Sequence, residues 1–266
     1  MGRGFSASYA STHELPLDGK FFLHLHDNYE IYLFLDGDCK YVVEENVYPL
    51  SPGDVIVIKK NQLHRVFHNA PSRYTRIVFN ISPSFFAENG CSEYEKKFVA
   101  PQEQSGNRIA AETVKESGLY EAIMRVRKYT DDFQNCDTPV AKAAMIEVLY
   151  LINSIELKKK TTALQGHMRE IIEYLNVNFK EDVTLDDLEK RFFISKYHIC
   201  HVFPELTGLT VHQYITKKRL AYAKELIESG KSAGFASDVA GFHHYSSFYR
   251  SFVSEYGVAP SVKKRG

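Results

Sequence analysis

The first part of the chain alternates short apolar-rich runs with turn-forming residues. Clear turn signals are Asp36-Gly37-Asp38 and Ser51-Pro52-Gly53-Asp54. Strands at such regular spacing, with few helix signals between them, predict a small β-sandwich or barrel. Residues 1–20 have no clear periodicity, and we expect them to frame the first strand. The predicted strands are Phe21–His26, Glu30–Leu35, Cys39–Val43, Val47–Leu50, Val55–Ile58, His64–Phe67 and Thr75–Phe79.

The pattern changes after residue 83. Residues 88–117 are polar and rich in turn formers, which predicts a loop region, and helical periodicity begins near Leu119. It is clearest over Pro139–Leu157, where apolar residues follow a 3-4-3-4 spacing. This helix either packs on its own barrel or pairs two subunits, because fewer than three heptads do not decide between them. Lys158–Thr162 is polar and is the expected interdomain linker.

The last hundred residues have helix starts and stops throughout. Met168–Leu175 is a first helix, and Thr184 with Asp187 three residues later predicts a capped second helix. Ser195 is expected to cap a third helix, and Val211–Ser229 reads as a long connecting helix.

A helical unit is repeated with a shift of 49 residues. Ile199 corresponds to Phe248, Phe203 to Phe252, and Gly208 to Gly257. Two copies of one unit within such a short segment indicate duplication of a helix-turn-helix.

This arrangement resembles the DNA-binding region of the AraC/XylS family of bacterial transcription regulators. The matching residues of the second copy are Gly241, Phe242, Ser246, Phe248, Arg250, Phe252, Gly257 and Pro260. Those of the first copy are Leu185, Leu188, Ser195, Ile199, Phe203 and Gly208. The resemblance implies an α+β fold of two domains: an N-terminal cupin-like β-barrel with helices, and a C-terminal all-α domain with two helix-turn-helix units. We expect the barrel at 1–83, a helical linker or dimerisation region at 84–160, and the DNA-binding domain at 161–266.

A recognition helix directed into the major groove presents the side chains of its first turns to base edges. Some residues depart from the family pattern. Pro204 is expected to end or bend its helix, Glu189 replaces a small residue, and Ala233, Ala236, Ser237 and Ala240 predict loose packing in the second unit. A degraded second unit that acts only through protein partners therefore stays an alternative. The candidate DNA-binding residues are Lys196, Tyr197, Cys200, His201, His243, His244, Ser247 and Arg250.

The predicted barrel contains His24-x-His26-x3-Glu30-x6-Gly37, followed by Gly53-x10-His64. These segments resemble the two cupin motifs, except that Lys59 and Asn61 replace the common Pro and Gly. Three imidazoles and one carboxylate suit a divalent metal, although the same residues can line a pocket for a small polar molecule or satisfy one another. The candidate effector-binding residues are His24, His26, Glu30, Tyr32, Tyr41 and His64, and the candidate metal ligands are His24, His26, Glu30 and His64. We expect no required cofactor, with a divalent metal in the cupin site left open.

Composition adds limited constraints. The 266 residues suit two modest domains, and 33 basic residues balance 33 acidic ones. From Thr162 to Gly266 there are 14 Lys or Arg against 12 Asp or Glu, a net charge of +2, so any DNA-binding surface depends on where charges are placed. The four cysteines are scattered, and neither a signal peptide nor a membrane-length apolar run is evident, which favours a reduced, cytoplasmic protein without a membrane partner.

These features predict a one-component transcription regulator, not an enzyme. The barrel is expected to sense a small molecule, a sugar or related polyol, and the helical domain to bind double-stranded DNA. RNA polymerase is a further expected partner, and a homodimer stays open. The alternative is a metal-dependent cupin enzyme with a vestigial helical domain.

Overall fold

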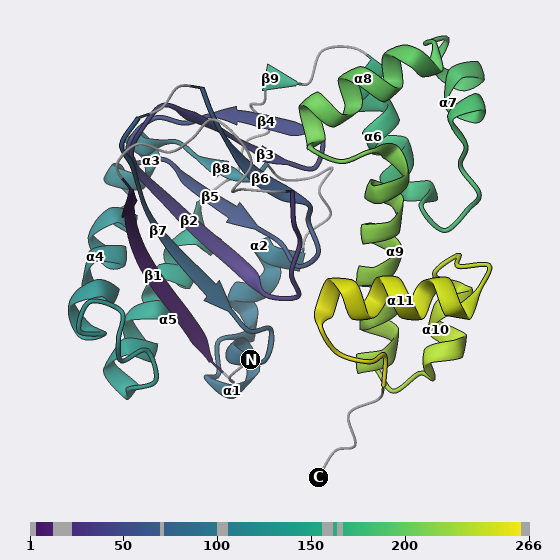
Figure 1. Cartoon of the computed structure of the whole chain (residues 1–266). Coiled ribbons are helices and arrows are strands. Elements are labelled where there is room, and N and C mark those ends of the chain that lie inside the picture. Colours follow the sequence, from purple (N-terminus) through teal and green to yellow (C-terminus); the bar gives the residue numbers. More distant parts are fainter. Residues whose placement is uncertain are drawn as a thin grey trace. The chain divides into compact units, whose positions relative to one another are not determined.

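Two sheets form the centre of the first unit, Met1–Thr162, and a bundle of helices forms the second, Ala163–Gly266 (Figure 1). The computed structural model describes residues 4–12, 23–69, 72–99, 106–155, 162–163 and 167–261. It confirms the predicted fold of a sheet-rich N-terminal domain and a helical C-terminal domain. Among the described residues, none of the helices is long and apolar enough to cross a bilayer.

The sheets have the strand orders β1-β7-β2-β5-β8 and β6-β3-β4-β9. The central pairings of the larger sheet, β2 with β5 and β2 with β7, are antiparallel. The strands are β1 (Phe5–Thr12), β2 (Tyr29–Asp36), β3 (Cys39–Val43), β4 (Asn46–Pro49), β5 (Val55–Ile58), β6 (His64–His68), β7 (Tyr74–Ile81), β8 (Arg108–Ile109) and β9 (Thr162–Ala163).

The five-stranded sheet is apolar on both faces. In β2, Ile31 and Leu33 join a core shared with the helices, whereas Tyr32 and Phe34 join a second core with side chains of the other sheet. Alternate residues of a strand point to opposite faces, so a strand buried on both sides reads as a nearly continuous apolar run. The unit is therefore built in three layers: helices, five-stranded sheet and four-stranded sheet.

Helices cover the outer face of the larger sheet. Residues of α4 and α5 share one apolar core with β2, β5 and β7. The apolar face of α5, including Met145, Val148 and Leu149, is fully buried in this core. Of the two interpretations of this helix, the structure therefore shows packing on its own sheet. The elements are α1 (Ser84–Glu88), η1 (Ser92–Glu95), α2 (Lys96–Val99), α3 (Ala111–Glu116), α4 (Leu119–Tyr129) and α5 (Pro139–Ser154).

Two expectations for this unit were wrong, and others fall partly or wholly outside the described residues. Residues 5–12, which have no clear periodicity, form β1 along the edge of β7. The predicted loop region 88–117 contains short helices and β8. The predicted strand Phe21–His26 begins outside the described residues, and its described part makes only an isolated bridge between His24 and His64. The end of the predicted helix at 156–157 and most of the linker, 158–161, also lie outside the described residues.

The second unit contains the duplicated helices. Thr184 and Asp187 form the predicted capping box of α7, and the Ser195 hydroxyl accepts the His198 N–H at the start of α8. The helices α8 and α11 lie 49 residues apart, and each ends at a glycine with positive φ. The helices are α6 (His167–Asn178), α7 (Leu185–Phe192), α8 (Lys196–Thr207), α9 (Val211–Glu228), α10 (Ala233–Val239) and α11 (Tyr245–Tyr256).

Pro204 does not end α8. The helix continues to Thr207, and the Gly208 N–H donates to the Pro204 carbonyl at 2.7 Å. Proline lacks one N–H donor but still provides an acceptor, so the last turn can close after it.

The small residues of the second helix-turn-helix are buried. Ala236, Ser237 and Ala240 are completely inaccessible to solvent, and both alanines share a core with Phe248 and Phe252. Small side chains allow a close approach of helices, so these positions belong to the core of the second helix-turn-helix, and its expected loose packing stays a prediction.

A junction joins the two helix-turn-helix units within the second unit. Arg219 of α9 donates to the carbonyls of Phe179 (2.6 Å) and Glu181 (2.8 Å), in the loop between α6 and α7. Gly241, before α11, lies against the same loop: a Cβ at this position would be 2.2 Å from the Lys180 carbonyl oxygen. His243 Nε2 contacts Asp182 Oδ1 of this loop at 2.6 Å.

We predict that Gly241→Ala destabilises the second unit more than Gly257→Ala. Both glycines have positive φ, which costs a non-glycine residue about 1 kcal/mol or more. At Gly241 the added methyl group also meets backbone, whereas at Gly257 no atom of the described residues lies within 4 Å of it. Urea unfolding of the full chain should give a loss of unfolding free energy at Gly241 that exceeds the loss at Gly257 by about 2 kcal/mol or more. Equal losses would contradict the close approach.

Candidate nucleic-acid interface and effector site

The predicted contact residues of α8 lie on one exposed side of the helix. Lys196, Tyr197, Cys200 and His201 are all exposed, whereas Ile199 is fully buried. The Glu189 carboxylate accepts the Lys196 backbone N–H at 3.1 Å, so this departure from the family pattern helps to cap the recognition helix. The predicted surface is therefore available to a partner, with its first turn fixed by α7.

Lys196 and His201 are both held by neighbours. Lys196 Nζ lies 2.9 Å from Asp186 Oδ1, which raises the pKa of Lys196 through a hydrogen bond and the carboxylate charge. His201 Nδ1 contacts the Tyr197 carbonyl at 2.8 Å, and the two rings lie 4.1 Å apart. A neutral His201 must donate from Nδ1 to this carbonyl, which leaves Nε2 as an acceptor.

The second recognition helix repeats this geometry. Arg250 occupies the position equivalent to His201, and its Nε donates to the Ser246 carbonyl, four residues earlier, at 3.3 Å. His201 bonds to Tyr197 over the same interval. In both copies the ring or guanidinium is thus oriented by its own helix. The terminal N–H groups of Arg250 remain well suited to a guanine edge or a phosphate.

The repeat adds residues that the sequence reasoning missed. Ser246 and Tyr249 are exposed and correspond to Tyr197 and Cys200. The 49-residue shift, applied to each predicted contact of the first copy, identifies both of them.

The two histidines before α11 have different positions. His243 is exposed and contacts Asp182, so it takes part in the junction. His244 is the exposed N-cap residue of α11, but within the described part of the chain its side chain makes no capping hydrogen bond. Ser247 is exposed one turn before Ser251.

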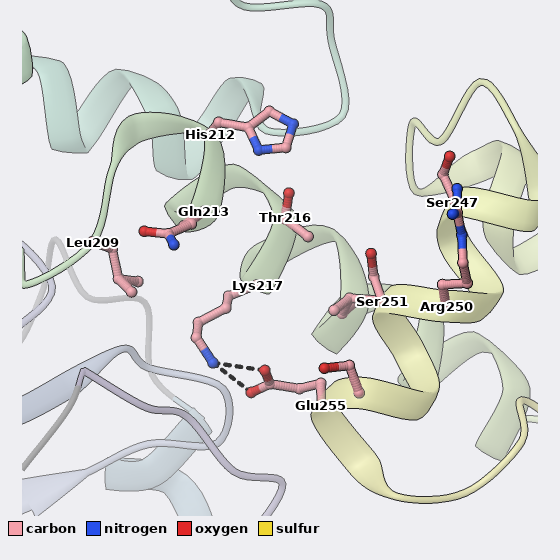
Figure 2. Close-up of a pocket in the computed structure, with 11 residues that line it drawn as sticks. Leu209, His212, Gln213, Thr216, Lys217, Ser247, Arg250, Ser251 and Glu255 are labelled. Atoms are coloured by element: carbon pink, nitrogen blue, oxygen red, sulfur yellow. Dashed lines mark hydrogen bonds and ion pairs between the residues drawn. The ribbon is translucent and has the colours of Figure 1, made fainter.

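A groove of about 660 Å³ lies between α9 and α11, as Figure 2 shows. His212 and Thr216 come from α9, whereas Ser247 and Arg250 come from α11, so predicted DNA contacts form part of its wall. Lys217 Nζ contacts both carboxylate oxygens of Glu255, at 2.6 and 2.7 Å. This ion pair neutralises the lysine inside the groove.

In the first unit, the predicted histidine cluster forms. Nitrogen atoms of His24, His26 and His64 all lie within 4.8 Å of one another. His26 Nε2 is 3.0 Å from Glu30 Oε2, and His64 Nε2 is 3.7 Å from the same oxygen. His24 is exposed and His64 is fully buried, so the cluster extends from the surface into the protein.

His26 and Glu30 form an ion pair. Burial by itself raises the pKa of Glu30, but the hydrogen bond with His26 and the adjacent His64 imidazole outweigh it and hold this pKa well below its usual range. Burial lowers the pKa of His26, and the hydrogen bond and charge of Glu30 reverse this, so the pKa of His26 is raised. Both shifts favour the charged forms of the two groups.

The two predicted effector-binding tyrosines lie in the interior core. The Tyr32 hydroxyl is 2.8 Å from the Tyr74 hydroxyl, and the Tyr41 hydroxyl donates to Glu30 Oε1 at 3.1 Å. Burial raises the pKa of Tyr32 and of Tyr41 well above the usual value. Their hydroxyls are thus satisfied inside the protein, and Tyr41 orients the carboxylate of the cluster.

The departures in the second cupin-like segment have structural consequences. Asn61 has a φ of 59°, a left-handed conformation that asparagine tolerates better than most residues, and its N–H donates to the His26 carbonyl at 2.9 Å. Lys59, the other departure, is buried, and this burial lowers its pKa to about 8.

A cavity of about 500 Å³ lies beside His26. Its polar lining is drawn from four separate segments, so no local motif could reveal it. It includes Ser6, His26, Asn28, Asn80, Ser82 and Gln134.

The turn that leads to Gln134 has an unusual backbone. Asp131, Asp132 and Phe133 have φ values of 51°, 54° and 73°, and left-handed conformations cost non-glycine residues about 1–2 kcal/mol each. Thr130 holds the turn, because its hydroxyl accepts the Phe133 N–H at 3.0 Å. Such local strain is frequent at ligand sites. This cavity is therefore a stronger candidate for the effector site than the predicted set of histidines and tyrosines.

Family models match both units. Residues 12–113 match the model of the AraC-like ligand binding domain, and residues 188–266 match that of a helix-turn-helix domain. The HTH-type transcriptional regulator YdiP of Escherichia coli K12 is 25% identical over 91% of this chain and 80% of its own length. The HTH-type transcriptional activator RhaS of Citrobacter koseri is 22% identical over 91% of this chain and 87% of its own length. Among solved structures, ToxT from Vibrio cholerae matches with 16% identity and a TM-score of 0.40, covering 98% of this chain and 99% of ToxT.

We predict that Glu255→Gln strengthens binding to random duplex DNA several-fold. The substitution removes a negative charge from the groove and frees Lys217, which can add one phosphate contact. Fluorescence anisotropy over a salt series should show the slope of log K against log salt steepen by up to about 0.9. Glu228→Gln removes the same charge outside the groove and should have little effect. An unchanged affinity and slope for Glu255→Gln would show that the groove does not face DNA.

Proposed function

Because the chain belongs to the AraC/XylS family of DNA-binding transcription regulators, we propose that it controls transcription in response to a small polar molecule, a sugar or related polyol. The DNA-binding part of this proposal is supported mainly by the equivalence of α8 and α11, which repeat at an interval of 49 residues. Each helix orients a side chain outward by a bond to the carbonyl four residues earlier. Two such helices suit two successive major-groove segments.

The cavity beside His26 supports the choice of ligand. Asn28, Asn80 and Gln134 offer amides, and Ser6 and Ser82 offer hydroxyls. Amides and hydroxyls both donate and accept hydrogen bonds, as recognition of a polyhydroxylated molecule requires. The ligand acts only if it binds two states of the protein unequally.

A regulator explains the helical unit better than an enzyme with a vestigial tail does. The second helix-turn-helix is complete, with a buried core and an exposed recognition face. The relatives YdiP and RhaS are transcriptional regulators by name. We therefore propose a non-enzymatic, cytoplasmic protein with RNA polymerase as a further partner. Homodimer formation stays a prediction, since the apolar face of α5 is used within the fold.

We predict that Arg250→Ala weakens binding to the DNA upstream of its own gene by about 1–3 kcal/mol, the usual discrimination of one bidentate base contact. Anisotropy titrations of the full chain on this DNA and on random duplex measure the effect. A base contact predicts a larger loss on the specific DNA, whereas a phosphate contact predicts equal losses and a shallower salt slope.

Lys128→Ala is the control for Arg250→Ala, because it removes one exposed positive charge from the first unit. It should leave both affinities nearly unchanged. Unchanged affinity in Arg250→Ala would instead favour a second unit that acts through protein partners.

We predict that Asn80→Ala abolishes the effector response and preserves DNA affinity in the absence of effector. The amide lines the cavity but lies in the first unit, so its loss removes ligand hydrogen bonds and leaves the recognition helices intact. Thermal shifts with a panel of sugars and polyols identify the ligand for the wild type, and the same ligand is then titrated into the DNA complex of each protein. An unaltered response in Asn80→Ala would place the effector elsewhere.

A further inference from the structure

His24 and His64 are fixed opposite each other by backbone pairing. The His24 N–H donates to the His64 carbonyl at 3.1 Å, and the His64 N–H donates to the His24 carbonyl at 2.9 Å. Directly paired residues project their side chains to the same side of a sheet. The two imidazoles therefore lie together, with ring centroids 4.3 Å apart.

The backbone also orients two of the imidazoles. His26 Nδ1 lies 2.9 Å from the Asn28 carbonyl, and His64 Nδ1 lies 2.8 Å from the Gln62 carbonyl. Since a carbonyl can only accept, each Nδ1 carries a proton and each Nε2 faces the cluster. A carbonyl on Nδ1 is the usual second-shell partner of a histidine that binds metal through Nε2.

The distances from Glu30 to two of the histidines are close to the spacing of a coordination sphere, and the ligand nitrogens of the three histidines lie within 4.8 Å of one another. With bonds of about 2.1 Å, neighbouring ligands around an ion lie roughly 3.0–3.4 Å apart. Glu30 Oε2 is 3.0 Å from His26 Nε2 and 3.7 Å from His64 Nε2. The other carboxylate oxygen accepts the Tyr41 hydroxyl, which holds the carboxylate in this orientation.

Within the described part of the chain, the ion pair of His26 with Glu30 leaves the Nε2 atom of His64 without a hydrogen bond. His64 is completely buried, and among the described residues its Nε2 has no partner within hydrogen-bond distance, since Glu30 Oε2 lies 3.7 Å away. A buried, unsatisfied polar atom costs about 1–3 kcal/mol, and it points into the cluster of donors. A metal ion would satisfy it, and the Nε2 proton of His26 would leave to solvent when the ion binds.

We propose that His24, His26, Glu30 and His64 bind one divalent first-row transition-metal ion. Three nitrogens and one carboxylate oxygen favour Zn²⁺, Fe²⁺, Co²⁺ or Ni²⁺ over Ca²⁺ and Mg²⁺, which prefer oxygen ligands. Because His24 is exposed, the site opens to solvent on its side.

The test is a titration of the chelator-treated full chain with Co²⁺, followed by its visible absorption and by calorimetry. We expect one equivalent to bind, with ligand-field bands that disappear when Zn²⁺ displaces Co²⁺. Mg²⁺ should not compete. Failure of the wild type to take up one equivalent of Co²⁺ or Zn²⁺ would overturn the proposal.

Variants link this binding to the cluster. His24→Ala changes an exposed residue and should weaken Co²⁺ binding at least about tenfold, and Glu30→Gln and His64→Ala should weaken it further. His167→Ala, an exposed histidine of α6, is the matched control and should bind as the wild type does. Wild-type affinity in His24→Ala and Glu30→Gln would show that the ion binds elsewhere. Circular dichroism of each variant checks that the fold is retained.

Discussion

The DNA-binding half depends on the contact between Arg219 and the loop that follows α6. One guanidinium donates to two backbone carbonyls, of Phe179 and Glu181, and lies over the Phe242 ring at 5.9 Å. Burial lowers the pKa of Arg219, but a guanidinium remains charged at neutral pH. Its planar fork can bind two carbonyls at once, so α9, the α6–α7 loop and the turn before α11 are tied together. Gly241 is required at this junction because the backbone passes too close for a side chain.

The sensor half depends on a sheet that is buried on both faces. Alternate residues of β2 enter the helix-covered core and the core between the sheets, and Glu30 belongs to the inner set. A carboxylate is stable there only with partners, which Tyr41 and His26 supply. The histidine cluster is therefore a consequence of the fold as well as a candidate site. Strand β2 directs the Glu30 carboxylate inward, and the residues around it stabilise its negative charge.

The sequence predicted elements with strong local signals. The helices α7 and α8 were found because Thr184, Asp187 and Ser195 are caps, and the repeat was found because its core residues recur at one interval. β1 was missed, since its partner β7 lies about seventy residues away and Phe5–Thr12 has no clear periodicity. The cavity beside His26 was missed for a similar reason: tertiary structure alone brings Ser6, Asn80 and Gln134 together. The His26–Glu30 contact was predictable from the motif, whereas the internal satisfaction of Tyr32 required knowledge of Tyr74.

The distribution of charge in the second unit has a consequence for regulation. Lys196 is paired with Asp186, Lys217 with Glu255, and Arg219 with backbone carbonyls. These cations are already engaged, and the region from Thr162 onward has a net charge of only +2. Phosphate contacts supply most of the non-specific affinity of DNA-binding proteins, so that affinity should be small here. The affinity for a specific DNA site then depends on a few oriented hydrogen-bond donors of the recognition helices. Because about 1.4 kcal/mol changes an equilibrium constant tenfold, a small effector that favours one state by this amount is enough to switch it.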